Sequence, residues 1–162
     1  MSENLEYLKD YLEKMVSMRK SIVPLPKGIH WAGIEDLVLN FGKSYELIEK
    51  PDYLSEGTPT QCFQNSAEAV FEHDKFLYVE GFALLKDINF PIHHAWIAEK
   101  GTTKAIDVTS DRLEGYFGVC FSLSYLRKHW RTRKNAASLL DNWEGGFPLL
   151  KMDRGKIQKI LA

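Results

Sequence analysis

The chain has 162 residues, of which 44% are hydrophobic and 27% are charged. These fractions lie close to the globular averages of about 45–50% and 25%, so they exclude a wholly disordered or fibrous chain. The 21 Lys and Arg residues nearly balance the 22 Asp and Glu residues, and the net charge of -1 provides no overall field that favours nucleic acid or an anionic membrane. The sequence predicts a single domain over 1–162, with a core at about 58–121.

Cysteine usage and the N-terminal composition bear on the cellular compartment. Cys62 and Cys120 are too few for a disulfide scaffold. The first residues lack the basic-then-apolar layout of a signal peptide. No apolar run approaches the roughly 18–20 residues that span a bilayer. We therefore expect a cytoplasmic protein that makes no membrane contact and whose cysteines stay reduced, Cys120 as a core residue.

Helical periodicity marks two segments near the N-terminus. An amphipathic helix is expected to end near Arg19-Lys20, on the spacing of Leu5, Leu8, Leu12, Met15 and Val16. The Pro-Leu-Pro-Lys-Gly segment at 24–28 breaks this helix. A second helix is predicted over Ile34–Phe41, with an extension over Tyr45–Lys50.

The middle of the chain predicts a helix followed by a meander of strands. Thr58 is the expected N-cap of the helix, Pro59 its first residue, and Gln61 the residue that completes a capping box. The helix is expected to run to about His73, with a buried stripe of Phe63, Ala67, Val70 and Phe71. β-branched and aromatic runs then predict strands over Phe76–Leu84, Ile92–Glu99 and Thr103–Val108.

The C-terminal third predicts a strand or turn at Tyr116–Val119, a helix at Ser122–His129 and a short helix near Asn135–Asp141. Residues 151–162 are expected to form a frayed or docked terminal segment. This order of elements predicts an α+β fold, in which the helix that carries Cys62 packs on an antiparallel sheet between N-terminal and C-terminal helices.

Cys62, His94 and Asp107 form a constellation that can carry nucleophilic chemistry. A cysteine nucleophile needs a thiolate, a base that pairs with its proton, and a group that orients the base. On the predicted capping, Cys62 is the fourth helical residue, where the helix dipole is weak, so His94 is expected to provide most of the activation.

The spacing of the strands allows a geometric expectation for the histidine. A hairpin that turns at Lys100-Gly101 places His94 directly opposite Asp107, with Cβ atoms about 4.5–5.5 Å apart. The carboxylate would then hold the Nδ1–H of His94 and leave Nε2 facing the sulfur. His93 would point to the opposite face, and a register slip of one residue would remove the arrangement.

These residues lie within a longer pattern, which consists of Cys-Phe-Gln-Asn-Ser-Ala at 62–67, Tyr-Val-Glu-Gly at 78–81, His-Ala-Trp at 94–96 and Asp-Val-Thr at 107–109. The pattern resembles the transglutaminase-like branch of the papain-like cysteine enzymes, in which a helix-borne cysteine precedes a His-Ala-Trp strand and an Asp-Pro-Thr strand. The similarity covers 61–109, less than a third of the chain. The continuation over 116–121 resembles small, mostly uncharacterised phage and bacterial proteins that share this core.

The resemblance implies a Cys–His–Asp site that acts on a protein or peptide amide through a thioester, without a cofactor. Cys62 would attack the carbonyl, His94 would protonate the leaving amine, and Asp107 would orient the imidazole. We expect a hydrolase, either a thiol protease or a deamidase. Transfer of the acyl group to an amine, as in transglutaminases, is the alternative.

The chain departs from the family pattern around the nucleophile. Val108 stands in place of proline, and Thr-Gln-Cys at 60–62 stands in place of Gly-x-Cys. Ser-Glu-Gly at 55–57 provides no glutamine of the kind that papain-like peptidases place before the cysteine. The backbone N–H of Cys62 is therefore the expected oxyanion donor, with the Gln61 side chain as a second candidate.

Other side chains are candidates for support and for substrate contact. Asn65 lies one helical turn after Cys62 and is expected to support the site. Three aromatic residues are candidates for lining a substrate groove: Trp31, Trp96 and Tyr116.

The sequence also contains residues that could bind a metal ion or an acidic partner. A metal site would draw on His73, His93, His94, Asp107 and Cys62. Adjacent histidines on a strand point to opposite faces and no His-x-x-x-His or Cys-x-x-Cys spacing occurs, so no metal is expected. The basic run at 127–134, which contains Trp130, is typical of a nucleic-acid or acidic-partner surface. A solvated helix face explains it more simply, so nucleic acid is not expected, and a non-catalytic binding protein that uses this run is the alternative.

Overall fold

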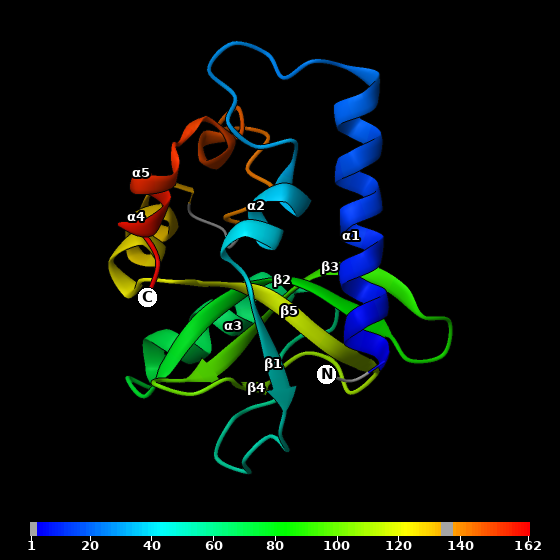
Figure 1. The fold of residues 1–162 in the computed structure, drawn as a ribbon. Helices are drawn as coiled ribbons and strands as arrows, with labels where there is room; N and C mark the ends of the chain where they lie inside the picture. The colour runs from blue at the N-terminus through cyan, green and yellow to red at the C-terminus, as the bar shows by residue number, and fades with distance from the viewer. Residues whose placement is uncertain (1–2, 134–137) are drawn as a thin grey trace.

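A computed structural model describes residues 3–133 and 138–162 (Figure 1). The elements in chain order are α1 (Glu3–Ile22), α2 (Ile34–Phe41), β1 (Lys43–Leu47), α3 (Cys62–Glu72), β2 (Phe76–Leu85), β3 (Phe90–Glu99), β4 (Lys104–Ile106), β5 (Leu113–Phe121), α4 (Leu123–Arg133), the 3-10 helix η1 (Pro148–Lys151) and α5 (Arg154–Gln158). The α+β class is confirmed. None of the helices in the described ranges is both long and apolar enough to cross a membrane.

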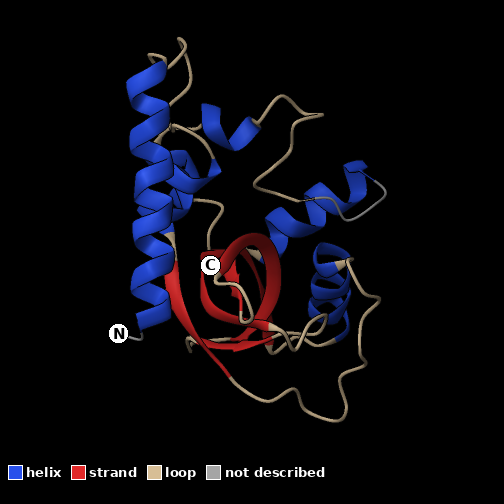
Figure 2. Ribbon diagram, turned by 90° about the vertical axis from the view of Figure 1, so that its right-hand side faces the viewer, coloured by secondary structure: helices blue, strands red, loops and turns tan. Residues whose placement is uncertain are grey.

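The strands close into a small barrel in the order β1-β4-β3-β2-β5, which Figure 2 shows as a ring with the long helix α1 beside it. Neighbouring strands are antiparallel except β1 and β4, which are parallel, so the sheet is mixed rather than antiparallel as predicted. The helical extension predicted over Tyr45–Lys50 is wrong, because residues 43–47 form β1 and close the barrel. Gly42 has an extended backbone at the end of α2, and a Cβ there would lie 2.4 Å from the Val38 carbonyl oxygen, so glycine fits this junction.

The two faces of the barrel strands bury different sets of side chains. One cluster fills the inside of the barrel, and all of its buried members lie on strands. They are Tyr45, Val79, Ala83, Trp96, Ala98, Ala105, Leu113 and Tyr116. The larger cluster combines the outer face of the strands with residues from the helices. Because side chains alternate along a strand, β2, β3, β4 and β5 each contribute to both clusters.

Two glycines allow the inside of the barrel to hold a tryptophan. Gly81 and Gly118 are paired across β2 and β5. A Cβ on Gly118 would lie 2.6 Å from the Trp96 ring, and one on Gly81 would lie 2.3 Å from the Phe117 carbonyl oxygen. Side chains larger than hydrogen at these two positions would therefore push β2, β5 and Trp96 apart.

Most of the remaining elements follow the predicted ranges. The first helix runs on to Ile22, the helix over Ile34–Phe41 is confirmed, and all three predicted strands of the meander are present, although β4 spans only 104–106. The strand-or-turn segment is the nine-residue strand β5. The short helix near Asn135–Asp141 is not formed in its described part, 138–141, and the rest of it lies outside the described residues.

The C-terminal segment is docked rather than frayed. Leu161 forms a bridge with Phe121 of β5, and Ile157 is completely buried. The indole N–H of Trp31 donates to the Met152 carbonyl at 2.8 Å. The last residues therefore belong to the folded core.

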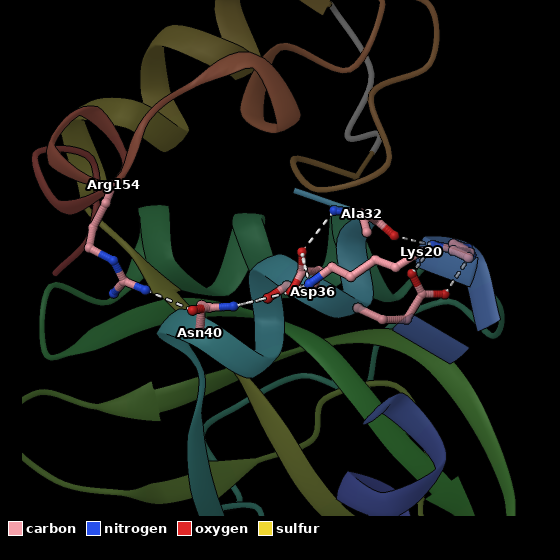
Figure 3. Close-up of polar contacts among 7 residues, drawn as sticks. Lys20, Ala32, Asp36, Asn40 and Arg154 are labelled. Atoms are coloured by element: carbon pink, nitrogen blue, oxygen red, sulfur yellow. Dashed lines mark hydrogen bonds and ion pairs between the residues drawn. The ribbon is translucent and has the colours of Figure 1, made fainter. Parts of the chain in front are cut away.

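A polar network joins α1, α2 and α5 (Figure 3). Asp36 accepts a hydrogen bond from the Ala32 backbone N–H at 2.8 Å and pairs with Lys20 of α1 at 3.3 Å. Asn40 donates to the Asp36 carbonyl at 2.8 Å and accepts from Arg154 of α5 at 2.7 Å. These contacts fix the two ends of the chain to α2.

Candidate active site

Cys62 is the first residue of α3, not the fourth residue of a helix. Thr60 has a left-handed φ of 69, and Gln61 is the N-cap, with a φ of -105 and no side-chain capping bond. The predicted capping box at Thr58 is therefore wrong. The backbone N–H groups of the first helical turn have no partner within the helix, so this end of α3 favours an anion. Cys62 lies closer to that favourable field than the sequence indicated.

Asn65 holds the loop that precedes α3. Its side-chain oxygen accepts from the Thr58 backbone N–H at 3.1 Å, and its amide nitrogen donates to the Thr58 carbonyl at 2.8 Å. The Thr58 carbonyl also accepts from the Gln61 N–H at 3.2 Å, and the left-handed Thr60 separates this turn from α3. The amide nitrogen of the Asn65 side chain also donates to Thr109 Oγ1 at 2.9 Å. Asn65 thus ties the loop before α3 to the loop after β4, where Asp107 lies.

His94 and Asp107 form a buried pair at one end of the barrel. His94 Nε2 donates to Asp107 Oδ2 over 2.7 Å, and the two residues are 4% and 9% exposed. The pairs Ile97↔Ile106 and Ala98↔Ala105 set a register shifted by two residues from the predicted one. Because side chains alternate with a period of two, this shift leaves both residues on the same face.

The shift of register changes which ring nitrogen faces the acid. A carboxylate directly opposite His94 was expected to bind Nδ1, but Asp107 lies diagonally across and beyond the end of β4. Diagonal neighbours are about 7–8 Å apart, so the far nitrogen of the ring is the one that reaches the carboxylate. Nε2 therefore holds Asp107, and Nδ1 is left for the thiol. The predicted assignment of the two nitrogens is wrong.

The Asp107 carboxylate accepts hydrogen bonds from several donors. Besides His94, its carboxylate accepts from the Tyr116 hydroxyl at 2.8 Å and from the backbone N–H groups of Thr109 at 2.8 Å and Ser110 at 3.0 Å. Burial by itself raises the pKa of Asp107, but the bonds from His94, Thr109 and Tyr116 outweigh it and lower the pKa below its ordinary value. The group is a fixed anion.

His94 is shifted in the opposite direction. Burial favours the neutral ring, but the hydrogen bonds to Asp107 and to the Cys62 side chain, with the charges of both groups, raise the pKa of His94 to about 9. At neutral pH the ring therefore carries a proton on each nitrogen, with a carboxylate on one side and a sulfur on the other. Cys62 is itself 8% exposed, so the reacting groups are almost shielded from water.

Two of the aromatic candidates lie inside the barrel, and the third, Trp31, lines a cavity whose walls do not include Cys62, His94 or Asp107. Trp96 is completely buried inside the barrel, with its ring 6.4 Å from that of His94, and it packs at 5.1 Å against Tyr116. Tyr116 is equally buried and binds Asp107. Both support the histidine and the acid from inside, which does not fit the predicted role in a substrate groove. Trp31 packs at 5.1 Å against Phe41 and lines an apolar cavity of about 380 Å³ together with residues 22–26 and Phe147.

A second acid–histidine pair, which the sequence analysis did not identify, lies next to the first. Glu80 of β2 is completely buried, and its Oε1 accepts from His93 Nε2 at 2.9 Å. A glutamate amid the apolar residues of Phe76–Leu85 is a signal of a partnered charge, because unpaired buried carboxylates are costly. The partner was not predictable, since it depends on the pairing of β2 with β3.

Among the described residues, no group of three or more His, Cys, Asp or Glu side chains is arranged to hold a metal ion. The Gln61 side chain is exposed, and the structure shows no bond from it to the site. No protein-family model matches the chain, and none of the curated proteins or solved structures compared with it matches either. Function must therefore be inferred from the geometry of the site.

Proposed function

We propose that this chain is a cysteine-dependent amide hydrolase with a papain-like or transglutaminase-like core. The observation that supports the proposal most directly is the sequence of contacts from the Cys62 side chain to His94 and from His94 to Asp107. A thiol, an imidazole held in one orientation, and an acid that stabilises the imidazolium are the groups that acyl transfer through a thioester requires.

In the proposed reaction, Cys62 attacks the carbonyl carbon of an amide as a thiolate. The oxyanion that forms would accept from the Cys62 backbone N–H, which lies in the first turn of α3 and has no partner within the helix. His94 donates the proton on Nδ1 to the leaving amine as the tetrahedral intermediate collapses to a thioester. The neutral ring then removes a proton from water, and attack by this water on the thioester releases the acid and restores the thiolate and the imidazolium.

The acceptor of the acyl group decides between hydrolysis and transfer. An amine that enters in place of water would give a transglutaminase reaction with the same residues. We favour hydrolysis, with a protein or peptide amide as the substrate.

A binding protein that uses the basic run at 127–134 is the second candidate. In the described part of this run, Arg127 and Arg131 are exposed on α4, and Trp130 packs against Phe71 of α3 with ring centroids 5.3 Å apart. An acidic partner could contact this surface without any reaction at Cys62.

Alkylation with iodoacetamide distinguishes the two candidates, because the two cysteines serve as site and control. Burial raises the pKa of Cys120 to about 11, so this thiol should react slowly at neutral pH. Cys62 should react fast and selectively, and His94→Ala should abolish the difference. Equal and slow reaction of both cysteines in the wild type would contradict the hydrolase.

The substrate can be sought in a second experiment on the full chain. A lysate of the natural host is incubated with the wild type and with Cys62→Ala, and covalent adducts are identified by mass spectrometry. An acyl group on Cys62 that is missing from the variant would give both the chemistry and the target.

A further inference from the structure

The fully buried carboxylate of Glu80 accepts hydrogen bonds from three separate parts of the chain. Besides His93, its carboxylate accepts from the Tyr78 hydroxyl at 2.8 Å and from the backbone N–H groups of Leu139 at 2.8 Å and Leu140 at 3.0 Å. The Ser138 hydroxyl donates to it as well. Burial alone raises the pKa of Glu80, but the bonds from His93, Ser138 and Leu139 reverse the effect and lower it. Glu80 is therefore an anion at neutral pH.

Packing alone does not explain a charge at this position. A hydrophobic side chain of similar volume often stabilises a core as well as a buried ion pair does, so a retained pair can serve to fix one arrangement. Here the arrangement includes His93, whose Nε2–H is fixed by the carboxylate. The rest of the ring lies between Phe63 and Phe82, with centroid distances of 5.1 Å and 5.6 Å.

Two residues that adjoin His93 connect it to the proposed site: Phe63, which contacts its ring, and His94, which follows it in the chain. Phe63 follows Cys62 directly in the first turn of α3, and His93 precedes His94 in β3. A displacement of the His93 ring would release Phe63 and would move the backbone of His94. The position of the sulfur relative to the imidazole therefore depends on contacts made on the opposite face of the strand.

We propose that Glu80 and His93 are positioning residues for Cys62 and His94, in that the carboxylate holds the His93 ring against Phe63 and so fixes the first turn of α3 beside β3. This inference rests on the proposed function, because it assigns the second pair a role in the same site. Neither residue contacts the reacting atoms.

The test measures the rate of Cys62 alkylation by iodoacetamide as a function of pH. Glu80→Gln removes the charge, and His93→Leu removes the donor while it keeps an apolar side chain against Phe63. In both variants the rate at pH 7 should fall about tenfold and the profile should move up by about one pH unit, the correspondence that a tenfold change in ionisation implies. His93→Gln keeps an amide N–H that can take the place of Nε2–H but has no ring to pack against Phe63, so its rate should fall less than that of His93→Leu.

Glu72→Gln is the matched control, since it makes the same substitution at an exposed position of α3. Circular dichroism establishes that each variant is folded. Folded Glu80→Gln and His93→Leu proteins with the wild-type profile would overturn the inference. If Glu80→Gln does not fold, the two His93 variants test the inference. Equal pH profiles of Cys62 alkylation in His93→Leu and His93→Gln would then overturn it.

The same experiment separates this inference from the proposed function. If His94→Ala leaves the alkylation of Cys62 unchanged, the proposed function fails whatever the Glu80 variants do. If His94→Ala abolishes the fast reaction and the Glu80 and His93 variants do not affect it, the proposed function stands and the positioning role fails.

Discussion

The raised pKa of His94 makes the stability of the protein depend on pH in a defined direction. The pKa rises from 6.5 to about 9 on folding, because the bonds to Asp107 and Cys62 outweigh the burial that opposes them. Above pH 6.5 the folded state therefore holds a proton that the unfolded state has lost. The contribution of His94 to the free energy of unfolding is complete below pH 6.5 and is lost as the pH rises through 9.

The size of this effect follows from the same values. One pKa unit corresponds to about 1.4 kcal/mol, so a rise from 6.5 to about 9 corresponds to a contribution of about 3 kcal/mol. His94 is 4% exposed, so solvent screens the interaction little. His94→Gln removes the titrating group and keeps a hydrogen-bonding side chain, which makes it the reference protein.

Urea unfolding at about pH 6 and pH 9.5 measures the effect, with the free energy obtained by linear extrapolation. The free energy of unfolding of the wild type should exceed that of His94→Gln by about 3 kcal/mol less at the higher pH than at the lower pH. In Cys62→Ser the bond to Asp107 remains, so that variant should still show most of the dependence. A difference that stays constant with pH would refute the inference that His94 is held as an imidazolium.

Three substitutions test other contacts of the site. Asp107→Asn should slow the alkylation of Cys62 at pH 7 at least about tenfold, because the loss of the charge lowers the pKa of His94; the rate is followed by mass spectrometry. Asn65→Ala leaves the Thr58 backbone N–H before α3 unpaired and should lower the free energy of unfolding by about 1–3 kcal/mol in urea. Gly118→Ala places a Cβ 2.6 Å from the Trp96 ring and should lower the melting temperature, with a cost of about 1–3 kcal/mol.

The controls for these substitutions come from the same chain. Gly155→Ala meets Asp153 at an ordinary 3.5 Å and lies in α5, so it should leave stability unchanged or raise it slightly. Gln64→Ala alters an exposed bond to Glu68 on the same helix as Asn65 and should have little effect. A Gly118→Ala protein as stable as the wild type would contradict the close approach of β5 and Trp96. An Asp107→Asn protein with the wild-type alkylation rate would contradict the role of the acid.

Local patterns in the sequence determined most of the elements. Apolar spacing is a property of a few consecutive residues, so α1, α2 and the strands β2 and β3 could be recognised without knowledge of their neighbours. The same reasoning brought His94 and Asp107 together. Alternation along a strand places both on one face, and this conclusion survives the two-residue shift in register.

Tertiary structure decided the features that depend on residues far apart in the chain. Residues 43–47 form a strand because they pair with β4 on one side and β5 on the other. The local sequence does not indicate that these two partners are available. The loop before α3 is held by an asparagine side chain seven residues away from its backbone partner, and the left-handed Thr60 delays the start of the helix. Apart from Tyr78 on its own strand, Glu80 gained its donors only when β3 and the segment at 138–140 met it. A sequence specifies the periods of its elements locally, but the partners of a buried charge and the edges of a barrel exist only once the chain has closed on itself.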